Sequence, residues 1–259
     1  MNITKYIANS EKGYGLRLAD GQGWQFIPTK GLKTWVEKLA SIMELEKCEP
    51  NGYSRLIFVK GEFNKDRERN SRQSQITNIL ENLLPSGWKQ HNLRALKLWH
   101  HHEVQDIICE IGPQKYPILD ITRMSLSLHP IYKQTLDSGG LPIHAALVEW
   151  NGVGFLLSAP GNTGKSTCCR RLPSPWHALG DDEALVVVDK QTLYQVHPFP
   201  TWSDFHSERS GRTWNVQKHL PLVAIFFLEH GKTDKVVPIG QGEAAILINQ
   251  SARHVCRRS

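Results

Sequence analysis

The stretch Val153-Gly-Phe-Leu-Leu-Ser-Ala-Pro-Gly-Asn-Thr-Gly-Lys-Ser-Thr167 decides the fold that the sequence predicts. Its apolar first part indicates a strand, and the glycine-containing loop after it leads into a helix expected over Thr167–Leu172. A second apolar run, Ala145–Trp150, precedes this stretch across an Asn151-Gly152 pair. Because Asn-Gly between two apolar runs is a strong hairpin signal, we expect a β-hairpin whose second strand enters the loop.

The loop matches the phosphate-loop (Walker A) pattern G-x-x-x-x-G-K-[ST] at Gly164, Lys165 and Ser166, while Ala159 replaces the first glycine. Glycines let successive N–H groups point at phosphate oxygens, and the following helix offers its N-terminus to the same anion. The lysine can reach the β- and γ-phosphates, and the serine hydroxyl can ligate Mg²⁺. The sequence therefore predicts binding of ATP with Mg²⁺ by Ala159, Pro160, Gly161, Asn162, Thr163, Gly164, Lys165, Ser166 and Thr167.

Two acidic sites compete as partners of this loop. Asp181 and Asp182 precede an apolar strand, where adjacent carboxylates could supply one metal ligand and one base. A polar turn is the plainer interpretation of this pair. Asp189 ends the same strand, as a Walker B aspartate does, but Lys190-Gln191-Thr192 after it favours a hairpin turn. A ligand role for Asp189 stays open.

His144 and a basic segment give weaker signals. A histidine at the start of a strand is more often structural than functional, and the residues alone favour that interpretation for His144. Arg209, Arg212, Lys218 and His219 lie between two expected strands. They would either contact a phosphate or an acidic peptide, or form a solvated loop.

The order of these elements resembles the HPr kinase/phosphorylase family and its kinase-like relatives over about residues 120–250. The shared features are a histidine before a strand, a hairpin, a phosphate loop, a short helix and a paired aspartate. His144 lies 21 positions before Lys165, as the corresponding histidine does in that family. The resemblance implies a core similar to the phosphoenolpyruvate carboxykinase-like P-loop fold.

The same resemblance implies roles for the acidic pair and the histidine. Asp181 or Asp182 would orient or deprotonate an acceptor hydroxyl, and the other would help to hold Mg²⁺. Ser166 and Asp182 are the expected metal ligands. His144 would contact the acidic pair or the phosphates, which makes it a candidate catalytic residue.

With His197-Pro-Phe-Pro-Thr-Trp-Ser203 after the kinase-like strand, the whole chain looks most like the SynChlorMet cassette protein ScmC family. That resemblance implies a place in a peptide-modification cassette. The expected function is an ATP- and Mg²⁺-dependent kinase, a transferase acting on a Ser or Thr hydroxyl of a peptide or protein.

Two other functions stay open. A nucleotide-binding module without transfer activity would act as a sensor or scaffold, although Lys165, Ser166 and both aspartates argue against it. A P-loop NTPase, such as a GTPase or a motor ATPase, is the other alternative. No N-K-x-D guanine motif follows the loop, which disfavours a GTPase.

Composition narrows the class of protein. Hydrophobic residues make up 40% of the 259 residues and charged residues 22%, which argues against disorder. The longest apolar run, 222–228, is far shorter than the roughly 18 residues of a membrane helix, and no signal peptide is evident. We therefore expect a cytoplasmic protein with five reduced cysteines and no membrane association. The net charge of +6 is too small to indicate nucleic-acid binding, and a homo-oligomer is allowed.

The expected fold class is α/β, in the mixed α+β sense, with a P-loop core and a small N-terminal α/β region. Residues 1–115 are expected to form an accessory region that could recognise a peptide, and residues 116–259 the HPr kinase-like P-loop domain. Outside the loop, we expect strands at 14–21, 54–60, 93–99, 103–111 and 116–124, helices at 34–45 and 126–136, an exposed loop at 61–75, and a strand at 220–229 that is buried on both faces.

Overall fold

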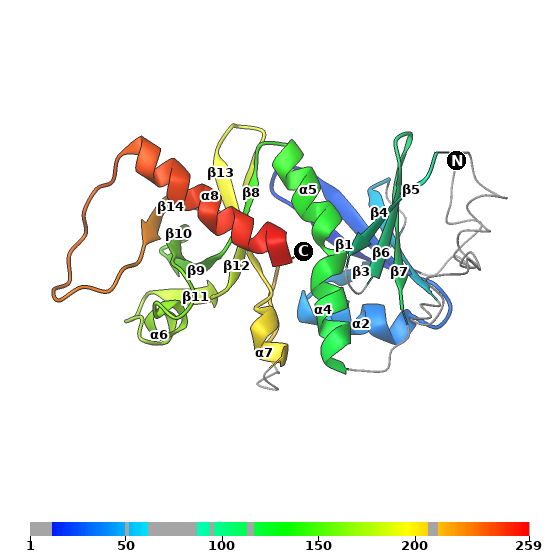
Figure 1. Ribbon diagram of the computed structural model, residues 1–259, viewed down its shortest axis with the longest axis horizontal. Coiled ribbons are helices and arrows are strands. Elements are labelled where there is room, and N and C mark those ends of the chain that lie inside the picture. Colours follow the sequence, from blue (N-terminus) through cyan, green and yellow to red (C-terminus); the bar gives the residue numbers. More distant parts are fainter. Residues whose placement is uncertain are drawn as a thin grey trace. The chain divides into compact units, whose positions relative to one another are not determined.

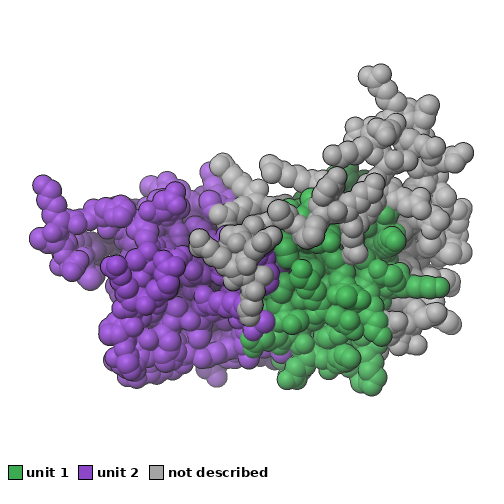
Figure 2. All heavy atoms as spheres, turned by 90° about the horizontal axis from the view of Figure 1, so that it is seen from below, with its two compact units in different colours: residues 1–17, 23–128 green, residues 18–22, 129–259 purple. Residues whose placement is uncertain are grey.

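The structure, a computed structural model, describes residues 12–49, 52–61, 87–93, 96–112, 117–206 and 212–258 (Figure 1). It divides into two compact units, residues 1–17 with 23–128 and residues 18–22 with 129–259 (Figure 2). Each unit contains a mixed sheet with a few helices, so the chain is a mixed α/β protein. The expected division into an accessory region, residues 1–115, and a kinase-like domain, residues 116–259, stays a prediction.

The first unit is built on a seven-stranded sheet with the order β3-β1-β2-β4-β7-β6-β5. Its strands are β1 (Gly13–Arg17), β2 (Gly23–Pro28), β3 (Glu46–Cys48), β4 (Ser54–Lys60), β5 (Lys89–Leu93), β6 (Leu96–His101) and β7 (Val104–Ile111). Strand β4 pairs in parallel with β2 and β7, and antiparallel pairs flank this centre. Residues 56–59 of β4 are therefore all buried, as in a strand covered on both faces.

Helix α2 (Lys33–Ile42) packs on this sheet. Its buried residues recur at helical spacing: Trp35, Val36, Leu39, Ala40 and Ile42. The Trp35 ring lies 5.3 Å from that of Phe58 in β4. The expected helix at 34–45 and strand at 54–60 are thus confirmed.

The expectation of a strand at 116–124 is wrong, because α4 (Pro117–Ser127) is helical. Proline at the first position of a helix has a suitable φ and lacks only an N–H that would be unpaired there. Three residues apart on this helix, Asp120 accepts a hydrogen bond of 3.0 Å from Arg123. Periodicity alone does not separate strand from helix in so short an apolar run. Except for Gly61, the loop expected at 61–75 lies outside the described residues.

The second unit is built on another seven-stranded sheet, with the order β11-β9-β10-β14-β13-β12-β8. Its strands are β8 (Leu141–Ile143), β9 (Ala145–Trp150), β10 (Val153–Ser158), β11 (His177–Gly180), β12 (Glu183–Val188), β13 (Tyr194–Phe199) and β14 (Leu220–Phe227). Its helices are α5 (His129–Asp137), α6 (Lys165–Arg170), α7 (Trp202–His206) and α8 (Gln241–Arg258). Strands β10 and β14 pair in parallel, and the other pairs are antiparallel.

The predicted hairpin joins β9 and β10. Asn151 and Gly152 have φ of 48° and 79°, the left-handed values that a two-residue type I′ turn requires. Trp150 pairs with Val153 and, at the other end, Ala145 pairs with Ser158. This register places His144, just before β9, at the end of β10 where the predicted phosphate loop begins.

A second hairpin joins β12 and β13, and it determines what faces that loop. Glu183 pairs with Phe199 at the end of the ladder. One step further along both strands, the paired aspartates before β12 lie opposite the residues that follow β13. The ends of the two hairpins therefore enclose the candidate site.

Strand β14 corrects another expectation, because it is not buried on both faces. Val223 is 59% exposed, and most of the strand is only half-buried. Helix α8 has its main contacts with β8 rather than with β14. Apolar sequence marks β14 as a strand but does not determine which element covers it. In the described part of the chain, no helix is both long and apolar enough to cross a membrane.

Candidate functional site

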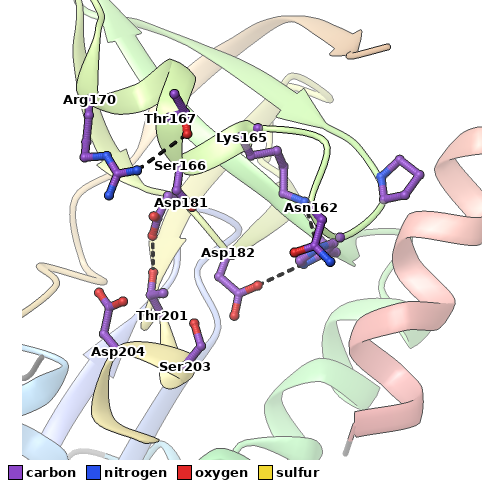
Figure 3. Close-up of a pocket in the computed structure, with 14 residues that line it drawn as sticks. Asn162, Lys165, Ser166, Thr167, Arg170, Asp181, Asp182, Thr201, Ser203 and Asp204 are labelled. Carbon is purple, nitrogen blue, oxygen red and sulfur yellow. Dashed lines mark hydrogen bonds and ion pairs between the residues drawn. The ribbon is translucent and has the colours of Figure 1, made fainter. Parts of the chain in front are cut away.

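The second unit contains a pocket of about 620 Å³ where the two hairpins end (Figure 3). The predicted phosphate loop and α6 form one wall, and the residues before β12 and after β13 form the other. Its lining residues are His144, Pro160, Gly161, Asn162, Gly164, Lys165, Ser166, Thr167, Arg170, Asp181, Asp182, Thr201, Ser203 and Asp204. A concave site of this size with convergent polar groups is suited to a small ligand.

The loop between β10 and α6 passes through the left-handed region at alternate residues. Asn162 has φ of 63° and Gly164 φ of 104°, and the space beside Gly161 and Gly164 is open. Such alternation turns successive N–H groups to one side and creates a concavity for an anion. Ala159 lies outside the left-handed region, so its Cβ in place of a glycine hydrogen causes no backbone strain.

Lys165, the first residue of α6, is a buried cation in the pocket wall. Its side chain is 6% exposed, and Nζ donates to the carbonyl oxygen of Ala159 at 2.7 Å. Nζ also lies 2.9 Å from Nε2 of His144. Because an ammonium group can only donate, Nε2 accepts and the imidazole proton belongs on Nδ1.

His144 connects this lysine to the acidic pair. Its Nδ1 lies 3.0 Å from Oδ1 of Asp182, a close polar contact without the alignment of a hydrogen bond. The backbone carbonyl of His144 accepts hydrogen bonds from Ser158 at 3.3 Å and from Ser251 of α8 at 2.9 Å. Its ring packs against that of His254, with centroids 4.4 Å apart. The imidazole is thus held between a cation and a carboxylate.

Asp181 has its partners on the other wall. Its Oδ1 accepts a hydrogen bond of 2.6 Å from the hydroxyl of Thr201, and Nη1 of Arg212 lies 3.9 Å away. Two adjacent carboxylates would repel each other if both were ionised without compensation. Their separate partners, Thr201 and Arg212 for Asp181 and His144 for Asp182, reduce that cost.

Ten of the predicted site residues line the pocket: His144, Pro160, Gly161, Asn162, Gly164, Lys165, Ser166, Thr167, Asp181 and Asp182. Two predicted loop residues do not. The side chain of Ala159 is buried, and the Thr163 hydroxyl donates to the carbonyl of Pro160 at 3.0 Å.

Asp189 lies in the turn between β12 and β13 and does not line the pocket. Its carboxylate accepts hydrogen bonds from the backbone N–H groups of Leu193 and Gln191 and from the side chain of Gln195, at 2.9, 2.8 and 3.0 Å. The bond from Leu193 is the largest cause that lowers the pKa of this exposed carboxyl group. The turn interpretation is therefore the one that the structure supports.

Four pocket residues lie outside the sequence prediction: Arg170, Thr201, Ser203 and Asp204. Thr201-Trp-Ser-Asp204 has the S/T-x-x-D pattern that begins helices, and this signal could have predicted α7. The presence of α7 in the pocket could not be predicted in that way, because it follows from the register of β12 against β13.

A family model for the SynChlorMet cassette protein ScmC matches residues 107–259. The chain belongs to the ScmC family. The match contains every pocket residue and all of the second unit except residues 18–22. The comparison with curated proteins gives no match.

The pocket of this ScmC-family protein has a donor set that suits Mg²⁺ and nucleotide phosphates. Mg²⁺ prefers oxygen ligands, and Ser166, Asp181 and Asp182 supply a hydroxyl and two carboxylates. Mg²⁺ usually keeps several waters and shares phosphate oxygens, so it needs few protein ligands. Among the described residues, no group of three or more His, Cys, Asp or Glu could hold a metal ion by itself.

A cysteine beside the pocket does not supply a nucleophile. Burial, together with the charge of Asp181, raises the pKa of Cys169 in α6 to about 11. The thiol is therefore protonated at neutral pH, and the reactive form of cysteine is the thiolate. The polar side chains that line the pocket of this ScmC-family protein carry oxygen and nitrogen groups.

Proposed function

We propose that this ScmC-family protein is an ATP- and Mg²⁺-dependent kinase that phosphorylates a Ser or Thr hydroxyl of a peptide or protein. One observation carries the proposal: Lys165, Ser166, Asp181 and Asp182 line the same pocket. Phosphoryl transfer needs a cation at the phosphates, an oxygen ligand for the metal and a carboxylate for the acceptor. The HPr kinase-like P-loop core is part of the same proposal, supported by the order of hairpin, loop, short helix and paired aspartates.

The loop wall would hold the phosphates. The open concavity at residues 161–164 would receive phosphate oxygens on its N–H groups, with Lys165 donating to the γ-phosphate. Ser166 and Asp182 would hold Mg²⁺, which when bound neutralises charge on the phosphates. Asp182 is assigned this role because its partner, His144, also contacts the lysine.

The opposite wall would receive the acceptor. Asp181 already accepts a hydrogen bond from the hydroxyl of Thr201, so its carboxylate is oriented toward hydroxyl groups on that wall. The acceptor oxygen would form a bond to the γ-phosphorus, and the bond from that phosphorus to the β–γ bridging oxygen would break. ADP leaves with the electron pair, and the acceptor proton passes to Asp181. Positioning and electrostatic stabilisation supply most of the rate enhancement.

The test is transfer from γ-labelled ATP to two pools of synthetic peptides, one with a central Ser or Thr and one with Ala at that position. We expect label in the first pool only. The double variant Asp181→Asn/Asp182→Asn should lose transfer but keep binding of a fluorescent ATP analogue. Asp189→Asn is the matched control, because this carboxylate follows the same strand outside the pocket, and it should keep both activities.

Other outcomes distinguish the alternatives. Nucleotide binding without transfer or phosphate release would indicate a binding module or scaffold. Phosphate release without labelled peptide would indicate an NTPase. Full transfer by the double variant would contradict the roles given to the two aspartates.

A further inference from the structure

A serine of the chain itself lies on the acceptor side of the pocket. Ser203 is in the first turn of α7, and its side chain is exposed. It lines the same pocket as Lys165 and Ser166 of the opposite wall. Figure 3 shows its hydroxyl on the side that carries Asp181 and Asp182. No role proposed so far uses this hydroxyl.

The hairpin register explains why Ser203 is there. Glu183 pairs with Phe199, and extending this antiparallel ladder by two residues sets Thr201 opposite Asp181. The 2.6 Å hydrogen bond between these two side chains agrees with that extension. Ser203 follows Thr201 by two residues and lines the same pocket as the acidic pair and the phosphate loop.

We propose that Ser203 is a site of self-phosphorylation in cis. The inference rests on the proposed function, since it needs a nucleoside triphosphate in the pocket. Oγ of Ser203 would form a bond to the γ-phosphorus, and the bond to the β–γ bridging oxygen would break. The nucleoside diphosphate would leave with that electron pair, and the serine proton would pass to Asp181.

Exposure and position single out Ser203 among the pocket hydroxyls. Thr201 is 3% exposed, so its hydroxyl is less accessible than that of the exposed Ser203. Ser166 and Thr167 belong to the phosphate wall and cannot approach the γ-phosphate from the acceptor side. Arg170 also lines the pocket, and a guanidinium group is a cation that pairs well with phosphate.

The test uses the full chain, treated with phosphatase and then incubated with MgATP. Intact mass measurement should show a gain of about 80 Da, one phosphoryl group, and fragmentation should place it on Ser203. Ser203→Ala should lose the gain, whereas Ser203→Thr should keep it because the hydroxyl is retained. Ser41→Ala removes an exposed hydroxyl of α2 in the first unit and should behave like the unaltered chain.

The order of the reaction tests the cis geometry. The fraction phosphorylated per unit time should stay constant when the protein is diluted. A rate that falls on dilution, or phosphate on another residue, would overturn the inference. If labelled peptide is produced without any gain in mass of the chain, the self-phosphorylation is wrong and the proposed function survives. Failure to bind ATP at all would overturn both.

Discussion

The two sheets of this protein both bury charged side chains, but in different settings. In the first unit, Nε of Arg55 donates to Asp106 at 2.7 Å across β4 and β7. Nε1 of Trp99 donates to Glu110 at 3.0 Å across β6 and β7. In the second unit, the buried Lys165 is connected through His144 to Asp182, and all three side chains border a pocket.

The difference shows that burial alone does not identify a charged side chain as part of a binding site. A cross-strand pair such as Arg55 and Asp106 satisfies both groups within the sheet, so neither needs a further ligand. Lys165 instead donates to a carbonyl and an imidazole, which a phosphate oxygen can outcompete because it carries a full charge. We therefore expect loss of the first arrangement to affect stability, and loss of the second to affect ligand binding.

Removal of the pocket cation should have the largest effect. Lys165→Met should lower phosphate release and peptide labelling by at least about 100-fold, because stabilisation of transferring phosphate by a fixed cation is worth that much or more. Steady-state phosphate release measures it. Lys133→Met, which removes an exposed lysine paired with Asp137 on α5, should retain full activity. Near-normal activity of the Lys165 variant would contradict the role of Lys165 in binding phosphate.

The cross-strand pair of the first unit should affect stability and not nucleotide binding. Arg55→Met leaves Asp106, 4% exposed, without its guanidinium partner, and should lower the free energy of unfolding by about 3 kcal/mol. Urea denaturation measures this, and a fluorescent ATP analogue should bind as before. Lys12→Met, which removes an exposed pair with Glu49, should leave the unfolding midpoint unchanged. A loss of nucleotide affinity in the Arg55 variant would contradict the contrast.

His197 sharpens the comparison, because it is a buried ionisable group of the second unit that does not line the pocket. Nδ1 lies 2.9 Å from the carbonyl of Val216, and Nε2 accepts the N–H of Ala19 at 3.1 Å. Burial lowers the pKa of His197 from 6.5 to about 4. Between these two pH values, His197 binds more protons in the unfolded chain than in the folded one. Its contribution to the free energy of unfolding is therefore fully present above pH 6.5 and is lost as the pH decreases.

The expected loss of unfolding free energy is about 2 kcal/mol between about pH 7.5 and about pH 5. His197→Gln should show a shallower dependence by that amount when urea unfolding is followed across this range. His177→Gln, at an exposed position of β11, should keep the slope of the unaltered chain. Equal slopes for all three proteins would show that His197 is not held neutral.

The smallest effect is expected at the hydroxyl that fixes Asp181. Thr201→Val keeps the shape of the side chain but removes the hydrogen bond of 2.6 Å, which should cost about 1 kcal/mol and lower transfer several-fold. Thr201→Ser should restore both. Labelling kinetics and urea midpoints measure the two effects, and an unchanged rate in the valine variant would exclude a positioning role for Thr201.

The sequence predicted those elements that have a local signal, either a pair of turn residues or apolar residues at helical spacing. The Asn151-Gly152 turn and the buried period of α2 are examples. The failures at α4 and β14 have a common cause. An apolar run indicates that a segment is at least partly buried. Whether residues 117–127 form a helix or a strand, and whether residues 220–227 are covered by another element, depends on residues far away in the sequence.

For the candidate site, the sequence by itself determined the loop chemistry, the spacing of His144 from Lys165 and the adjacency of Asp181 and Asp182. Only the tertiary structure decided which groups meet. The register of β9 against β10 places His144 beside Lys165. The register of β12 against β13 places Thr201 and the start of α7 beside Asp181 and Asp182. Register is set by how whole strands bury their apolar faces, so it brings together side chains far apart in sequence that no local pattern relates.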